Sequence, residues 1–217
     1  MKNKIKIDIV SDVVCPWCII GYKRLEKAIK ELGFEDKIEI EWHPFELNPN
    51  MPVEGENVIE HVSNKYGMNK EQALASQKSM TNNGEELGFK FNYFDEMKIV
   101  NTRDAHILLD FAKEFGKQTK LKMRLMGAFF SEQKDISNRD ILLKEFQGIG
   151  LDIDKAREIL KDEKNREEIK IKESSWQKKG ISAVPTMIFN NDSMMNGAYP
   201  VETYKQVLSE LIENGNE

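Results

Sequence analysis

Strand patterns lie near the two ends of this 217-residue chain, and they constrain its fold more than any other feature. Residues Lys4 to Val10 alternate, with isoleucine at every second position, which predicts a strand. A helix is expected from Cys15 to Gly33, and a second alternating strand over Lys37 to His43. This order predicts a right-handed βαβ unit. Because buried parallel strands are usually apolar throughout, these alternating strands are expected near an edge of the sheet or exposed at one end.

The middle of the chain carries helical signals alone. From Asn57 to Lys179, apolar residues recur at helical spacing. Thr102 is placed to cap one of these helices, and Asp154 is placed to open another. We therefore expect a block of helices between the two strand-forming parts of the chain.

The C-terminal part returns to strand patterns. Residues Thr186 to Phe189 and Ser193 to Met195 are expected to form a hairpin around the turn at 190–192. A last helix is expected with Pro200 at its first position. The length corresponds to about one and a half domains. The order predicts an α/β fold in which a domain made of residues 1–54 and 180–217 is interrupted by an all-helical insertion of residues 55–179.

Composition excludes several classes of protein. The net charge of −5 argues against nucleic acid or an anionic membrane as the partner. The chain has no run of about 18 apolar residues and no signal-peptide pattern at its start. We therefore expect a soluble, cytoplasmic protein with no membrane association. Its two cysteines are too few for a disulfide scaffold.

Both cysteines lie where the first predicted strand meets the first predicted helix. Cys15 is at the expected N-cap, and Pro16 is at the first helical position, where a missing N–H loses no hydrogen bond. The unpaired N–H groups and the positive end of the helix dipole favour a thiolate at Cys15. We expect Cys15 to be the nucleophile. Cys18, one turn further along, is expected to be less exposed and to resolve a mixed disulfide on Cys15.

Two other interpretations of this pair stay open. One is a packed thiol pair or a structural disulfide, which the reducing cytoplasm disfavours. The other is half of a zinc site, but structural zinc takes four ligands, and His43, His61 and His106 are scattered through the sequence. We expect no metal, although a site that recruits a distant histidine stays open.

Pro185 enters a predicted strand, where it removes a hydrogen-bond donor. It is either a trans proline that begins the strand, or a cis proline whose turn leaves the neighbouring backbone free near the cysteines. The residues around it and around the cysteines carry a family resemblance. Four segments, 11–18, 42–49, 101–106 and 197–200, resemble the FrnE-like branch of the DsbA-type thioredoxin-fold oxidoreductases.

The resemblance covers nearly the whole chain. It implies a thioredoxin fold, a mixed sheet of βαβ and ββα units, with a large helical insertion domain. It also implies a cis Pro185 that faces Cys15 and, with Val184, helps to hold a substrate in extended pairing. Pro16 and Trp17 would tune the redox potential. The implied function is thiol–disulfide exchange with a disulfide-bearing protein or a small thiol, without a cofactor.

The same superfamily contains glutathione-dependent enzymes, the hydroxychromene carboxylate isomerases and the kappa-class glutathione transferases. They typically have serine where this chain has Cys15, so both cysteines favour dithiol chemistry, with glutathione as a possible co-substrate. A redox-silent binding or chaperone module is a further alternative. Substrate, direction of electron flow and oligomeric state stay open.

Three more residues have two interpretations each. His43 is either a proton relay near the cysteine helix or an exposed polar residue at a strand end. His106 is expected to be a partly buried, hydrogen-bonded histidine between helices rather than a catalytic one. Trp17 is either a substrate contact or a packing residue.

Overall fold

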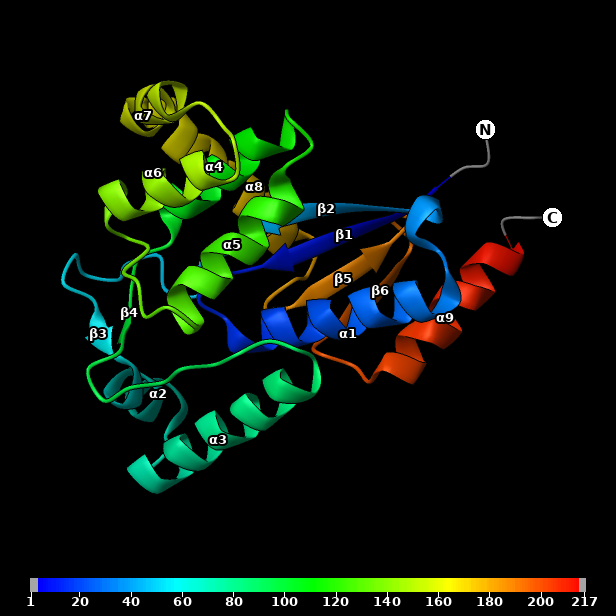
Figure 1. Ribbon diagram of the computed structural model, residues 1–217, viewed down its shortest axis with the longest axis horizontal. Helices are drawn as coiled ribbons and strands as arrows, with labels where there is room; N and C mark the ends of the chain where they lie inside the picture. The colour runs from blue at the N-terminus through cyan, green and yellow to red at the C-terminus, as the bar shows by residue number, and fades with distance from the viewer. Residues whose placement is uncertain (1–3, 215–217) are drawn as a thin grey trace.

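The computed structural model describes residues 4–214 and contains a four-stranded mixed sheet with helices on both faces (Figure 1). The strand order is β2-β1-β5-β6. The bounds are β1 Ile5–Ser11, β2 Ile38–Pro44, β5 Thr186–Phe189 and β6 Ser193–Asn196. Strand β1 is parallel to β2 and antiparallel to β5, and β5 and β6 form a hairpin. The predicted βαβ unit and the returning hairpin are therefore confirmed.

The alternation of the first two strands has a structural cause. Strand β2 is at an edge of the sheet, as expected, whereas β1 is central. On the polar face of β1, Asp8 is 1% exposed and forms ion pairs with Lys6 and His43. The charged residue in a central strand is thus paired rather than solvated, which is how buried charges persist.

Two helices cover one face of the sheet side by side, α1 (Pro16–Leu32) and α9 (Val201–Asn214) (Figure 1). Helix α1 begins at Pro16 and ends before Gly33, whose φ of 63° suits a residue without a side chain. The prediction for α9 was wrong by one position. Pro200 precedes the helix, and its carbonyl oxygen accepts hydrogen bonds from the N–H groups of Thr203 and Tyr204.

Seven helices lie between β2 and β5 in the described part of the chain. They are α2 Val58–Tyr66, α3 Lys70–Glu86, α4 Arg103–Lys113, α5 Gln118–Phe130, α6 Arg139–Gly148, α7 Ile153–Lys161 and α8 Glu163–Lys178. The expectation of helices alone was wrong in one detail. Strands β3 (Glu56–Asn57) and β4 (Lys98–Ile99) form a small antiparallel sheet, too short for any periodic signal.

Two predicted helix starts also need correction. Thr102 occupies the N-cap position of α4, but its side chain makes no capping bond there. Asn101 acts instead, because its Oδ1 accepts the N–H of Arg103. Helix α7 is capped by Asp152 rather than opened by Asp154, since the Asp152 carboxylate accepts two N–H groups of the first turn.

The inserted helices pack directly on the sheet. Helices α4, α5 and α8 contact the edge strand β2. The Gln118 side chain accepts the N–H of Trp42 and donates to its carbonyl oxygen, both at 2.9 Å. A side chain of α5 thereby satisfies both backbone groups of one residue on the open edge of β2.

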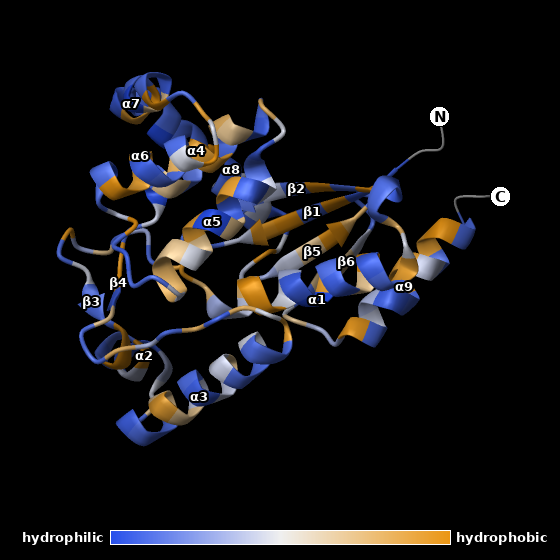
Figure 2. Ribbon diagram, viewed as in Figure 1, coloured by the Kyte–Doolittle hydropathy of each residue, from blue (hydrophilic) through white to orange (hydrophobic). Residues whose placement is uncertain are grey.

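One continuous apolar core joins the sheet to the inserted helices. It contains Ile7 of β1, Leu25 of α1 and Leu125 of α5. Strand β1 is among the more hydrophobic parts of the ribbon, whereas the outer helices α3 and α7 are mixed or polar (Figure 2). The division of the chain into two domains at residues 54 and 180 stays a prediction. Within residues 4–214, no helix combines the length and apolarity that a bilayer crossing needs.

Candidate active site

The two cysteines are at the start of α1. Cys15 is the N-cap residue with extended backbone angles (φ −93°, ψ 112°), and Cys18 donates its N–H to the Cys15 carbonyl oxygen at 3.1 Å. Both are free thiols, with Cys15 4% exposed and Cys18 fully buried. The order of exposure agrees with the sequence prediction.

Pro185 lies against the same end of α1. The Val184–Pro185 peptide bond is cis, the form that the resemblance implies. The Cys15 thiol donates to the Val184 carbonyl oxygen at 3.9 Å, so residues far apart in the sequence meet at the sulfur. A Cβ atom on Gly21 would come within 3.1 Å of the Pro185 ring, and this close approach explains the glycine inside the helix.

Trp17 and Pro16 separate the two cysteines. Trp17 is 39% exposed, so its indole is available to a molecule that approaches Cys15. Pro16 lines an apolar cavity described below. The exposure of Trp17 is compatible with a substrate contact.

A buried lysine near the cysteines was missed by the sequence analysis. Lys122 of α5 is 1% exposed, and its Nζ donates to the Ser11 carbonyl oxygen at 3.4 Å. Burial lowers the pKa of Lys122 to about 8, although negative charge at Cys18, Asp12 and Cys15 would raise it. The signal was available, because Lys122 shares helical spacing with the apolar residues at 125, 126 and 129.

The electrostatics of Cys18 follow from this setting. Burial, together with a hydrogen bond and the negative charge at Cys15, raises the pKa of the Cys18 thiol well above its ordinary value. The ammonium of Lys122 acts in the opposite direction. Burial therefore favours the thiol form of Cys18, and the Lys122 ammonium favours its thiolate.

Asp12 is a second buried charge beside the motif. Its carboxylate accepts the N–H of Val13 at 2.7 Å and that of Leu47 at 2.8 Å, and it lies 3.2 Å from His106 Nε2. Burial would raise the pKa of Asp12, but His106 and the Leu47 N–H lower it below its ordinary value. His106 is 2% exposed and hydrogen-bonded, so it is even more buried than predicted.

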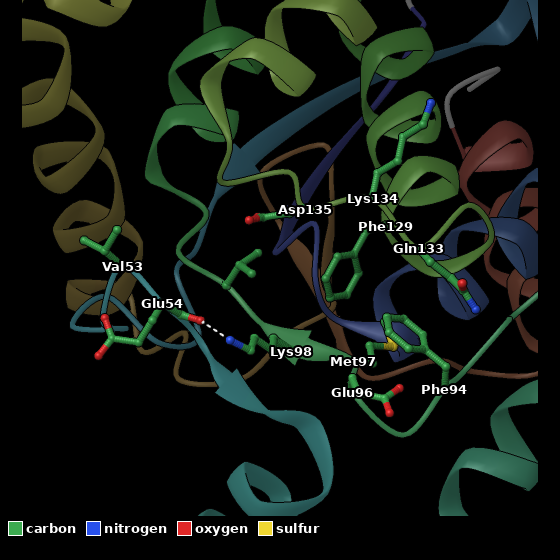
Figure 3. Close-up of a pocket in the computed structure, with 11 residues that line it drawn as sticks. Val53, Glu54, Phe94, Glu96, Met97, Lys98, Phe129, Gln133, Lys134 and Asp135 are labelled. Carbon is green, nitrogen blue, oxygen red and sulfur yellow. Dashed lines mark hydrogen bonds between the residues drawn. The ribbon is translucent and has the colours of Figure 1, made fainter.

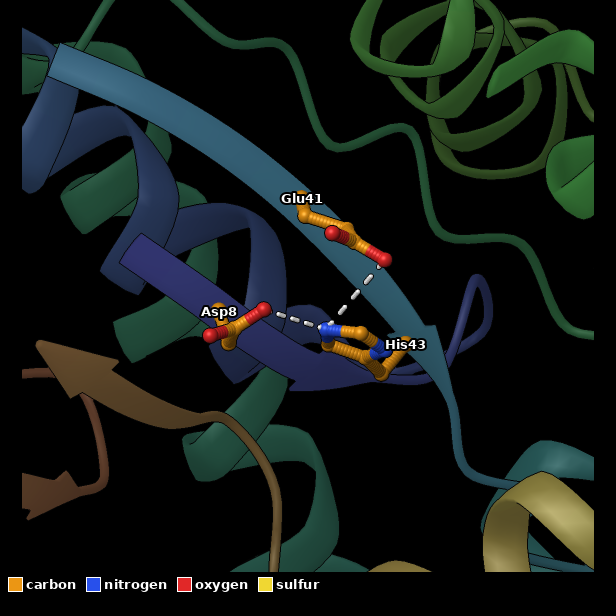
Figure 4. Close-up of side chains that lie close together, drawn as sticks. All are labelled: Asp8, Glu41 and His43. Atoms are coloured by element: carbon orange, nitrogen blue, oxygen red, sulfur yellow. Dashed lines mark hydrogen bonds and ion pairs between the residues drawn. The ribbon is translucent and has the colours of Figure 1, made fainter. Parts of the chain in front are cut away.

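His43 lies in a different cluster (Figure 4). Its Nε2 is 2.6 Å from Asp8 Oδ1 and 3.9 Å from Glu41 Oε1, and its ring packs on Trp176 with 4.6 Å between centroids. It is not exposed at a strand end, since only 14% of its side chain is accessible. Nor does it contact either cysteine within the described contacts, so the proton relay stays a prediction.

The same three residues have the spacing of metal ligands. One ligand atom each from Asp8, Glu41 and His43 lies within 4.8 Å of the others. The Lys6 ammonium, however, is 2.9 Å from both carboxylates, so it neutralises the cluster. This grouping contains neither cysteine, so it is separate from the cysteine pair.

Two cavities lie near the inserted helices. One, of about 80 Å³, is lined by Val14 and Pro16 of the cysteine segment and by apolar side chains of α2, α3 and α5. The other, of about 220 Å³, has charged groups such as Lys98 in its wall and includes neither Val14 nor Pro16 (Figure 3). Both cavities contact Met97 and Phe129, but the apolar one is closer in sequence and space to Cys15.

Comparisons with known proteins agree with the fold. The chain is 30% identical over 210 residues to the uncharacterized protein YwbO of Bacillus subtilis (strain 168), covering 95% of this chain and 96% of YwbO. A probable DsbA oxidoreductase, SCO1869 from Streptomyces coelicolor, matches with a TM-score of 0.88 and 28% identity over 95% of this chain and 89% of the other.

More distant structures share the fold. The cytosolic disulfide reductase DsbM from Pseudomonas aeruginosa with GSH matches with a TM-score of 0.66 and 16% identity, over 96% of this chain and 99% of that chain. The FrnE-like branch is consistent with these neighbours. The model of the DSBA-like thioredoxin domain matches residues 6–209. By fold and by sequence, the chain belongs to the family of DSBA-like thioredoxin domains.

Proposed function

We propose that this protein is a thiol–disulfide oxidoreductase that works through Cys15 and Cys18. The observation that carries the proposal is a pair of free thiols one helical turn apart, with Cys15 at the N-cap of α1. The first-turn N–H groups and the helix dipole stabilise a thiolate at this position. The DsbA-type family supports the reaction class.

The exchange has two steps. The Cys15 thiolate attacks one sulfur of a substrate disulfide, so a mixed disulfide forms and the other sulfur leaves as a thiolate. Cys18 then loses its proton and attacks the Cys15 sulfur. The products are a Cys15–Cys18 disulfide and the second substrate thiolate, so the substrate is reduced by two electrons and the protein is oxidised by two. Run backwards, the same steps oxidise a dithiol.

Lys122 is a positioning residue in the second step. Its ammonium is buried with Cys18 and favours the thiolate form that must attack. The Val184 carbonyl oxygen accepts the Cys15 thiol, and Val184 and Pro185 are proposed to hold the substrate. Pro16 and Trp17 are proposed to tune the redox potential.

The test is insulin reduction with dithiothreitol as the electron donor, followed by mass spectrometry. Cys15→Ser should abolish the activity. Cys18→Ser should retain the first attack and accumulate a mixed disulfide on Cys15. The chain has no other cysteine, so every adduct reports on this pair. Full activity of folded Cys15→Ser protein would overturn the mechanism.

The substrate partner is a disulfide-bearing protein or a small thiol, and glutathione is a candidate co-substrate. The fold match to a disulfide reductase determined with GSH supports testing glutathione first. Equilibration of the protein with reduced and oxidised glutathione would give its redox potential and so the direction of electron flow. A potential near that of the cytosolic glutathione pool would suit a reductase or isomerase.

A glutathione-dependent transferase or isomerase is the second candidate. The fold match to a structure determined with GSH supports glutathione binding. Calorimetric titration separates the two candidates. Glutathione binding by the Cys15→Ser, Cys18→Ser double variant would support the transferase, because this binding requires no disulfide exchange. No binding at millimolar concentration would count against it.

A further inference from the structure

The apolar cavity adjoins the proposed nucleophile. Val14 and Pro16, the residues on either side of Cys15, both line it. The opposite walls come from the inserted part of the chain, with Val62 of α2 and Ser76 of α3 among them. The cavity therefore adjoins the segment that carries Cys15.

The residues that line the cavity disfavour binding of a charged group. Among residues 4–214, no Asp, Glu, Lys, Arg or His lines the cavity, and its polar lining side chains are Ser76, Gln77 and Tyr93. The Tyr93 hydroxyl donates to Met80 Sδ at 3.3 Å, so its hydrogen is already used. A carboxylate or an ammonium in this cavity would find no counter-charge, and burying one unpaired is costly. An apolar group needs no counter-charge, so its burial in the cavity carries no such cost.

The volume of the cavity limits which apolar group can fill it. A cavity of about 150 Å³ holds a benzene molecule. At about 80 Å³, this one is close to half that size. It matches the branched end of a leucine, isoleucine or valine side chain better than an aromatic ring.

We infer that this cavity receives an aliphatic side chain that neighbours the substrate cysteine. The substrate class is then a peptide disulfide with leucine, isoleucine or valine next to the cysteine, rather than oxidised glutathione with its charged ends. The inference rests on the proposed function, because it assigns a specificity to the first attack by Cys15. Attack by Cys15 forms a mixed disulfide and releases the first peptide thiolate, and resolution by Cys18 releases the second. The protein dithiol thus supplies the electron pair that reduces the peptide disulfide.

Symmetrical peptide dimers test the preference. The disulfide dimers of Ac-Leu-Cys-Gly-NH2, Ac-Gly-Cys-Gly-NH2, Ac-Glu-Cys-Gly-NH2 and Ac-Phe-Cys-Gly-NH2 offer two equivalent sulfurs, so the site of attack does not vary. Each is mixed with the fully reduced protein, and the released peptide thiol is followed in a single turnover. The leucine dimer should react about tenfold faster than the glycine dimer, because its side chain is removed from water in the transition state. The glutamate dimer should be slowest, and the phenylalanine dimer should not exceed the leucine dimer.

Paired variants test whether the cavity causes the preference. Ser76→Phe fills it and should bring the leucine-to-glycine rate ratio close to one, because the leucine side chain can no longer enter the cavity. Ser79→Phe places the same ring on an exposed position of the same helix and should keep the ratio. Val62→Ala enlarges the cavity and should move the preference towards the phenylalanine dimer.

The outcomes separate the two proposals. If the wild-type protein reduces the leucine and glycine dimers at equal rates, the inference is overturned and the proposed function stands. If Ser76→Phe protein reacts normally with the glycine dimer and retains the tenfold ratio, the preference lies elsewhere and the inference again fails. If no dimer reacts at all, the proposed function itself fails.

Discussion

Lys122 from the inserted helix α5 donates a hydrogen bond to the carbonyl oxygen of Ser11, at the end of the strand that leads to the cysteines. The ammonium is thereby held in the core, where its charge acts on Cys18. The two cysteines are held by the sheet and α1, but the positive charge that acts on the buried Cys18 comes from the inserted helix α5. The two parts of the chain therefore form one site.

Replacing this lysine should slow resolution of the mixed disulfide. In Lys122→Met protein the Cys18 thiol loses the charge that favours its ionisation, and one pKa unit corresponds to about a tenfold smaller thiolate fraction. We expect about tenfold slower release of the second substrate thiol, with the protein at least as stable. Quenched-flow mass spectrometry would count the trapped mixed disulfide. Lys120→Met, at an exposed position of the same helix, is the control. An unaltered release rate would remove Lys122 from the second step.

Glu173 should make stability depend on pH near neutrality. Its burial and the charge of Glu46 raise the pKa of Glu173 from 4.5 to about 7. The folded value exceeds the unfolded one, so its contribution to stability is complete below about pH 4.5 and is lost as the pH rises through 7.

Glu173→Gln should therefore stabilise the protein at pH 8, by about 1 to 3 kcal/mol, and have little effect at pH 4. Glutamine can still accept the N–H of Glu46 through Oε1, as the carboxylate does. Urea unfolding at both pH values is the measurement. Glu168→Gln, at an exposed position of α8, should show no such difference. A Glu173→Gln protein with the wild-type pH profile would contradict the assignment.

His43 should matter for stability and not for thiol exchange. Burial opposes ionisation of Asp8, but hydrogen bonds from His43 and Lys6 lower the pKa of that carboxyl. His43→Ala removes one of these partners and the packing on Trp176, so we expect a loss of about 1 to 3 kcal/mol in unfolding free energy. The rate of insulin reduction should stay within about twofold of the wild type. A tenfold slower rate in the folded variant would instead favour the proton relay.

Asp12 should be intolerant of its amide analogue. Its carboxylate oxygens accept two backbone N–H groups, and an asparagine side chain would present an NH2 group to one of them. We expect Asp12→Asn to lower the unfolding free energy by about 2 to 4 kcal/mol. Asp110→Asn breaks a partly exposed ion pair with Lys172 and should cost less than about 1 kcal/mol. Similar losses for both variants in denaturant unfolding would refute the role of the Asp12 hydrogen bonds.

The sequence predicted the elements that depend on interactions between residues close together in the chain. The period of the isoleucines in β1, the proline that opens α1 and the glycine that ends it all act within a few residues, so the sequence predicted the strand, the helix and the position of Cys15 between them. Strands β3 and β4 have two residues each, and no period can be detected in two residues.

The rest of the site depends on contacts across the chain. Lys122 is more than one hundred residues away from Cys18, and nothing in its own helix indicates that the buried end faces a thiol. For His43, the contacts across the chain changed the interpretation that its sequence position allowed. Its sequence position after a strand left a catalytic role open, but register places it opposite Val10 and beside Asp8, in an ion-pair cluster.

The pairing of Gln118 with Trp42 has a consequence for the behaviour of the molecule in concentrated solution. An open strand edge offers N–H and C=O groups to any other extended chain, and a substrate for thiol exchange is often such a chain. By occupying both groups of Trp42, one amide side chain closes that edge to a passing strand. Unfolded polypeptide is thus kept from pairing with β2 at Trp42, which removes one place where chains could aggregate.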